Sequence, residues 1–81
     1  MARLSVVILN WNGRAHLERY LPSVVAHTSG DAEVVVADNG STDDSLQWLR
    51  LNYPEVRVVR LDRNYGFAGG YNRALREIEA E

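Results

Sequence analysis

Three apolar runs, each followed by polar residues, divide the chain at residues 4–9, 33–37 and 56–61. The first two are nearly continuous and rich in β-branched residues, which is typical of strands buried on both faces of a sheet. The third is more alternating, with Arg57 inside it and Arg60 near its end. That pattern predicts a strand at the edge of the sheet, with one less covered side.

Helical spacing separates these runs. Apolar residues recur every three or four positions in residues 17–25 and 46–53, and residues 73–81 have a helix-favouring composition. Pro22 should bend the first helix, and Pro54 should stop the second. The order β-α-β-α-β-α predicts an α/β protein with an open three-stranded parallel sheet and right-handed crossovers.

Ligands of open parallel sheets bind beyond the carboxyl ends of the strands. Here those ends lead into three polar, glycine-bearing loops, at residues 10–13, 38–41 and 62–66. Because parallel strands place their carboxyl ends at one edge, we expect the three loops to form a single site.

Asp38 directly follows the second apolar run and has two interpretations. An ionised carboxylate accepts hydrogen bonds but cannot donate them, so it suits a ligand N–H such as a pyrimidine imide. The same carboxylate can instead close an Asx turn into the following helix. Its position favours neither interpretation over the other.

The residues after Asp38 predict a tight turn followed by the start of a helix. Gly40 suits the geometry of a tight turn. Ser41, Asp43 and Asp44 are predicted to cap the second helix rather than to contact a ligand, because two carboxylates would repel an anion there.

Short amides flank Trp11 at the end of the first run. Asn10 and Asn12 can hydrogen-bond the edge of a base, and Asn12 can also cap the first helix. Trp11 can stack on a base or pack against the neighbouring helix, and both options stay open. Trp48, within the second helix, is predicted to pack.

Arg63 and Asn64 precede a glycine-rich turn at residues 66–70. Arginine is a natural partner of a diphosphate, and the glycines allow a close backbone approach. A surface arginine beside a helix start is the alternative. The glycine spacing is not that of a dinucleotide-binding fingerprint.

Composition limits the function classes. Apolar residues make up 46% and charged residues 25%, as in globular proteins. A net charge of −2 gives no electrostatic reason to expect nucleic acid or an anionic membrane as partner. The lack of cysteine excludes disulfides and thiolate metal sites and is compatible with the cytoplasm. His16 and His27 are expected to face solvent.

Residues 5–13, 35–43 and 64–72 together resemble three motifs of inverting family 2 glycosyltransferases. The Asn-Trp-Asn and Gly-Phe-Ala-Gly-Gly stretches look most like the rhamnosyltransferase-like branch. The resemblance implies the nucleotide-binding half of a GT-A (Rossmann-like) fold. Residues 1–81 would be the truncated N-terminal part of an enzyme that transfers a hexosyl or rhamnosyl group in polysaccharide biosynthesis.

The resemblance also implies residue roles. Asp38 would hold the pyrimidine of a UDP- or dTDP-sugar, and Asn10 and Asn12 would line the base and ribose pocket. Arg63 and Asn64 would lie near the ribose or diphosphate. The full set of nucleotide-binding residues implied is Asn10, Trp11, Asn12, Asp38, Asn39, Gly40, Arg63, Asn64, Gly66 and Asn72.

The family's Asp-X-Asp motif, which binds Mg²⁺ or Mn²⁺, and its general base do not occur in these 81 residues. We therefore expect no catalytic or metal residue here and an inactive fragment. The full enzyme would take a sugar, lipid-linked or polysaccharide acceptor, in the cytoplasm or at the inner face of the membrane. The alternative is a non-catalytic nucleotide-binding or self-association module, forming homo-oligomers through an exposed sheet edge or apolar helix faces.

Overall fold

The computed structural model describes residues 4–28 and 32–80. Strands and helices alternate along the chain, and the strands form one parallel sheet in the order β1-β2-β3. The predicted α/β class and element order are thus confirmed. The elements are β1 (Leu4–Asn10), α1 (Arg14–Ala26), β2 (Ala32–Asp38), α2 (Ser45–Asn52), β3 (Arg57–Arg60) and α3 (Gly66–Ala80).

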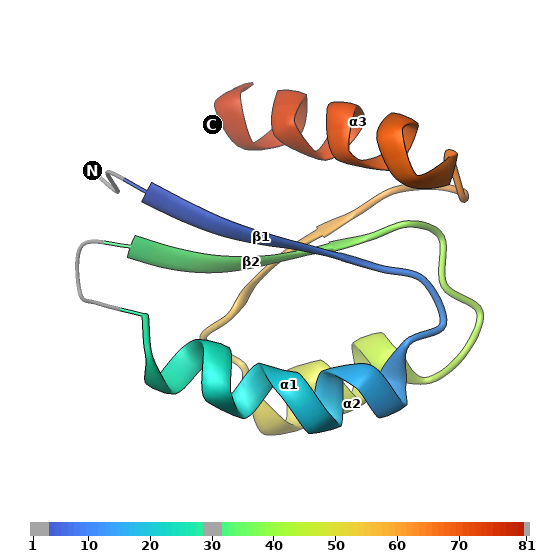
Figure 1. Ribbon diagram of the computed structural model, residues 1–81. Helices are drawn as coiled ribbons and strands as arrows, with labels where there is room; N and C mark the ends of the chain where they lie inside the picture. Colours follow the sequence, from blue (N-terminus) through green and yellow to red (C-terminus); the bar gives the residue numbers. More distant parts are fainter. Residues whose placement is uncertain (1–3, 29–31, 81) are drawn as a thin grey trace.

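The sheet lies between two helical layers, with α1 and α2 on one face and α3 on the other (Figure 1). Side chains of β2 alternate between the two faces, and both faces are buried. Val35 and Ala37 belong to the core beneath α3, while Val36 packs in the core with Leu21 of α1 and Leu49 of α2. β2 is therefore the buried central strand that its unbroken apolar run predicts.

The edge strands differ from β2 in burial. β3 lies at one edge, as its alternating pattern predicts. β1 lies at the other edge, and its residues 5–9 are half-buried. The expectation that β1 is buried on both faces holds only in part: Val7 and Leu9 pack on the α3 side and Ile8 on the other, but none of them is fully buried.

The helix boundaries follow the sequence signals in part. α2 ends at Asn52, before Pro54, as expected. α1 continues through Pro22 to Ala26. The prediction that Asn12 caps α1 is wrong, because the cap position is Gly13 and the Asn12 side chain bonds the second loop instead. Trp48 packs as predicted, with its ring 5.8 Å from that of Tyr53.

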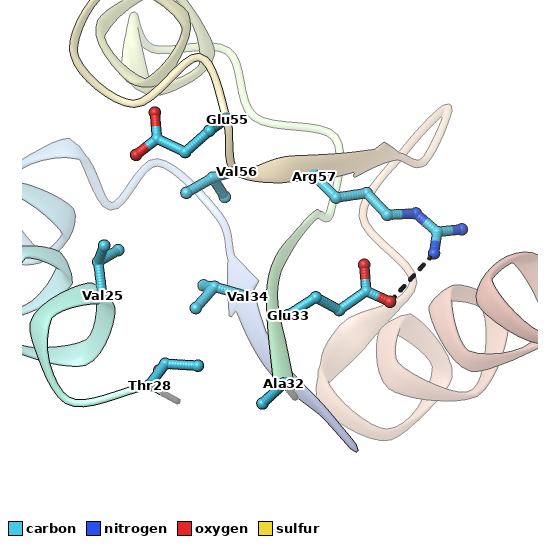
Figure 2. A pocket seen from close by; sticks show the side chains of 8 residues that line it. All are labelled: Val25, Thr28, Ala32, Glu33, Val34, Glu55, Val56 and Arg57. Carbon is cyan, nitrogen blue, oxygen red and sulfur yellow. Dashed lines mark ion pairs between the residues drawn. The ribbon is translucent and has the colours of Figure 1, made fainter. Parts of the chain in front are cut away.

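The amino-terminal edge of the sheet holds a cavity of about 300 Å³ (Figure 2). Val25, Val34 and Val56 line its apolar side, and Glu33 and Arg57 form an ion pair at 3.6 Å beside it. Between α1 and β2, residues 29–31 lie outside the described part of the chain. This cavity is at the opposite end of the strands from the three polar loops.

Candidate functional site

The three polar loops meet at the carboxyl edge of the sheet. Parallel register aligns Asn10 of β1, Asp38 of β2 and Arg60 of β3. The alignment continues one residue further through the backbone: the Asn39 amide donates to the Asn10 carbonyl at 2.8 Å, and the Leu61 amide donates to the Asp38 carbonyl at 2.8 Å. The loops therefore leave the sheet side by side.

Asp38 organises the first of two hydrogen-bond networks at this edge. Its side chain is fully buried on the α1 and α2 side of the sheet. The Ser41 amide donates to Oδ2 at 2.9 Å, and the Ser41 hydroxyl donates to Oδ1 at 2.6 Å. Asp38 thus closes the turn into α2, which is one of the two roles that the sequence allows. Its contact with a pyrimidine stays a prediction.

Asn10 joins β1 to this network. It is buried, and its Nδ2 donates to Asp38 Oδ1 at 2.9 Å and to the Ser45 hydroxyl at 3.0 Å. Ser45 is the first residue of α2 and is fully buried. Sequence reasoning missed Ser45, because a serine at a helix start reads as a cap whether or not a distant asparagine bonds to it.

Asn12 fastens the two loops together from outside. Its Oδ1 accepts from the Thr42 amide at 2.7 Å and from the Asp43 amide at 3.1 Å, and its own amide donates to the Ser41 hydroxyl at 2.9 Å. Asn12 has a positive φ of 49°, a conformation that asparagine tolerates better than most residues. These hydrogen bonds join the loop at residues 10–13 to the loop at residues 38–44.

The predicted capping residues divide into three roles. Asp43 Oδ1 accepts from the Ser45 amide at 3.1 Å, so Asp43 satisfies the start of α2, and its Oδ2 accepts from the Arg14 amide at 3.3 Å. Asp44 forms an ion pair with Arg14. Ser41 bonds Asp38 and does not cap, which corrects the prediction for that residue. Asp43 and Asp44 therefore also contact Arg14, the first residue of α1.

The Asp43 carboxyl has a pKa below its ordinary value of 3.8. Desolvation acts to raise the pKa, but hydrogen bonds from the Ser45 hydroxyl and amide and from the Arg14 amide together outweigh it. Asp43 is therefore a carboxylate at neutral pH, placed between the starts of two helices.

Asn39 organises the second network, on the α3 side. It is buried, its Oδ1 accepts from the Tyr65 amide at 2.9 Å, and its Nδ2 donates to Asn64 Oδ1 at 3.1 Å and to the Gly66 carbonyl at 3.0 Å. A Cβ on Gly70 would lie 2.7 Å from Asn39 Nδ2. Gly70 was missed as a site residue, although its place in a glycine-rich stretch was the available signal.

Gly40 brings the second and third loops into contact. Its φ is +75°, and a Cβ there would lie 2.5 Å from the Arg63 carbonyl carbon. Gly66 also has a positive φ, +77°, but a Cβ there would meet open space. Glycine is needed at position 40 for both its conformation and its close approach.

Several predicted residues present exposed side chains at this edge. Trp11 is 54% exposed, and Arg63, Asn64 and Asn72 are exposed as well. Between the second and third loops lies a hollow of about 360 Å³, lined by Gly40, Ser41, Thr42, Arg60, Leu61 and Asp62. The carboxyl edge thus combines a rigid buried framework with exposed aromatic, amide and guanidinium groups.

In residues 4–28 and 32–80, no group of three or more histidine, cysteine, aspartate or glutamate residues is arranged to hold a metal ion. The described helices include none with the length and apolar character needed to cross a membrane. Asp43 accepts a hydrogen bond from the Ser45 amide, and Asp44 forms an ion pair with Arg14.

Several known proteins are similar in sequence to this chain. The chain is 36% identical over 75 residues to N-acetylglucosaminyl-diphospho-decaprenol L-rhamnosyltransferase of Mycobacterium tuberculosis, covering 93% of the chain and 24% of that protein. It is 36% identical to an uncharacterized glycosyltransferase of Nostoc, in a match that covers 98% of this chain and 26% of the relative. It is 34% identical to chondroitin synthase of Escherichia coli, covering 90% and 11%.

The chain therefore spans about a quarter or less of the length of these relatives. A sequence model of glycosyl transferase family 2 matches residues 5–81, which include every strand end described above. That match covers all three motifs on which the resemblance rests. On this finding, the chain belongs to glycosyl transferase family 2.

Proposed function

We propose that this chain is the donor-nucleotide-binding part of an inverting glycosyltransferase that uses a pyrimidine nucleoside-diphosphate sugar, such as a UDP- or dTDP-sugar. The observation that carries the proposal is the joining of three strand-end loops into one surface by Asn10, Asp38 and Asn39. Carboxyl edges of parallel sheets are where such ligands bind.

Trp11 is the proposed stacking partner of the base. Trp11 is 54% exposed and directly follows Asn10, the last residue of β1. Arg63 is the proposed partner of the diphosphate, since an exposed guanidinium offers a planar set of N–H donors to phosphate oxygens. Asp38 would reach the imide of the base only if the Ser41 side chain moved away from it.

The base-stacking role predicts a measurable loss of affinity. We expect Trp11→Ala to weaken UDP or dTDP binding by roughly 5- to 150-fold, since stacking on an aromatic side chain contributes about 1–3 kcal/mol per base. Tyr20→Ala is the matched control, because Tyr20 is also 54% exposed but lies on α1. Calorimetric titration of both variants measures the difference, and equal affinities would remove Trp11 from the site.

Glycosyl transfer itself is proposed for a whole enzyme, of which this chain would be the truncated N-terminal part. The Mg²⁺ or Mn²⁺ proposed for that enzyme has no matching ligand cluster among the described residues. Without a general base to activate the acceptor, this chain alone is expected to be inactive. Incubation with UDP- or dTDP-sugars and Mn²⁺ tests this, and measurable donor hydrolysis or transfer would contradict it.

The relatives bear on the substrates of the whole enzyme. One of them is named for rhamnosyl transfer to a lipid diphosphate-linked sugar, and another for chondroitin synthesis. We propose hexosyl or rhamnosyl transfer to a sugar, lipid-linked or polysaccharide acceptor, carried out in the cytoplasm or at the inner face of the membrane. Assays of the whole enzyme with rhamnosyl donors and with other hexosyl donors distinguish rhamnosyl transfer from transfer of another hexose.

Self-association is the second candidate function. β1 pairs with β2 alone among the described strands, and its outward edge leaves backbone donors and acceptors for a further strand. Sedimentation at high concentration tests this reading. A single monomeric species throughout would rule out association through that edge.

A further inference from the structure

A positively charged hollow lies between the end of β3 and one flank of α3. Its volume is about 460 Å³, and Arg60 of β3 and Arg73 and Arg76 of α3 line it. Residues 57–76 hold five of the nine arginines of the chain and one of its eleven acidic residues. This stretch has a net charge of +4, although the whole chain has a net charge of −2.

Tyr65 positions one arginine of this hollow, Arg73, and also Arg63 of the neighbouring loop. The Arg73 guanidinium carbon lies 3.9 Å from the centroid of the Tyr65 ring, and that of Arg63 lies 4.9 Å from it. The Tyr65 hydroxyl donates to the carboxylate of Asp62, which fixes the ring. Contact with the face of an aromatic ring positions a guanidinium while its N–H groups stay available for hydrogen bonds.

None of the ion pairs found within residues 4–28 and 32–80 involves an arginine of the hollow, although the Arg73 charge is close enough to Asp62 to help lower the pKa of that carboxyl. The ion pairs of that part of the chain involve Arg14 and Arg57, and not Arg60, Arg73 or Arg76. Asp62 and Glu77 also line the hollow and oppose an anion. Three guanidinium groups against two carboxylates, one of them engaged by Tyr65, leave the hollow positive.

We propose that this hollow binds a phosphate group, carried either by a soluble phosphate compound or by the headgroup of an anionic phospholipid. The planar guanidinium of arginine can donate paired hydrogen bonds to the oxygens of a phosphate group. In this hollow, α3 supplies two of the arginines and β3 supplies the third. This hollow shares Arg60, Leu61 and Asp62 with the hollow between the second and third loops, but Trp11 does not line it, and α3 supplies the rest of its charge. Exposure to solvent makes its affinity dependent on salt.

Titration of the ¹⁵N-labelled chain with pyrophosphate tests whether the hollow binds a soluble phosphate compound. Sodium chloride keeps the ionic strength constant during the titration. Saturable shifts of the amides in residues 60–65 and 73–77 are expected. Co-sedimentation with phosphatidylcholine vesicles, with and without phosphatidylglycerol, tests whether the hollow binds an anionic phospholipid headgroup. Saturation by pyrophosphate alone identifies a soluble ligand, and binding to phosphatidylglycerol vesicles identifies a headgroup. Failure of both probes overturns the proposal.

Paired variants test which arginines are responsible. Arg73→Gln with Arg76→Gln should weaken binding of the effective probe by about tenfold or more, as expected for lost charge-assisted hydrogen bonds. The control is Arg19→Gln with Arg50→Gln, which removes the same charge from α1 and α2, and Arg19 also lies over a tyrosine ring, that of Tyr20. Equal losses in both pairs would show a general charge effect and refute the site.

Arg63 is also the proposed partner of the nucleotide diphosphate, so pyrophosphate shifts confined to residues 60–65 are assigned to the nucleotide site, and shifts at residues 73–77 decide the phosphate site. Uridine, which has no phosphate, serves as the separating probe. Shifts from uridine near Trp11 without pyrophosphate shifts near Arg73 would support the nucleotide site and refute the phosphate site, and the reverse result would do the opposite.

Discussion

Asp38 shows where single residues can and cannot be interpreted from sequence. Its place after a buried apolar run predicted that it would lie at a strand end, and it does. Whether it faces a ligand or closes a turn depends on which N–H groups lie within about 3 Å, and composition and spacing do not encode that distance. In the structure, Ser41 and Asn10 occupy its carboxylate.

The close approach of Gly40 to Arg63 gives a stability prediction. Gly40→Ala should lower the free energy of unfolding by more than about 2 kcal/mol, because the new Cβ adds a backbone clash to the roughly 1–2 kcal/mol cost of a positive φ. Gly66→Ala should show the conformational cost alone, since open space surrounds that position. Urea unfolding compares the two, and a larger loss at Gly66 would contradict the packing of the loops.

The hydrogen bonds of Asp43 predict a pH dependence. Its folded pKa is below 3.8, so its contribution to stability is complete above that pH and is lost as the pH falls through the lowered value. The difference in urea midpoint between the native chain and Asp43→Asn should therefore be constant from pH 5 to 7 and shrink below 3.8. A difference that widens in acid would contradict the assigned bonds.

At the scale of elements, composition placed the third helix at residues 73–81 behind a glycine-rich turn at residues 66–70, but α3 begins at Gly66 and those residues are helical. Periodicity predicted the three strands and the helices α1 and α2. It did so because apolar β-branched runs and three-to-four residue spacing report local geometry directly. It did not predict how exposed β1 is, since burial of an edge strand depends on neighbours rather than on the strand itself. It also misassigned Asn12, whose side chain bonds the second loop and not its own helix.

α2 offers a matched test of the core. Leu49 is fully buried between α2 and β2, and Leu51 on the same helix is 78% exposed. Leu49→Ala should cost about 2–5 kcal/mol, which equals most of the roughly 3–5 kcal/mol available to so small a core. Leu51→Ala should change stability by less than about 0.5 kcal/mol. Circular dichroism during thermal unfolding distinguishes them, and similar midpoints would show that α2 is not docked.

At the scale of the whole molecule, average composition concealed an uneven distribution of charge. The net charge of −2 gave no electrostatic reason to expect nucleic acid or an anionic membrane, yet residues 57–76 of β3, α3 and the loop between them contain five arginines. Sequence motifs predicted which loops would meet, because the parallel order of strands fixes one common edge. They did not predict that two separate buried networks, around Asp38 and Asn39, would hold those loops on opposite faces of the sheet.

The account rests on the three loops acting as one pyrimidine nucleotide site. Titration of the ¹⁵N-labelled chain with UDP and dTDP measures this most directly. We predict that amides in residues 11–13, 40–42 and 63–66 shift together with a single dissociation constant, and that ADP binds at least about tenfold more weakly, a difference of 1.4 kcal/mol. Shifts confined to one loop, or none at millimolar nucleotide, would contradict the account.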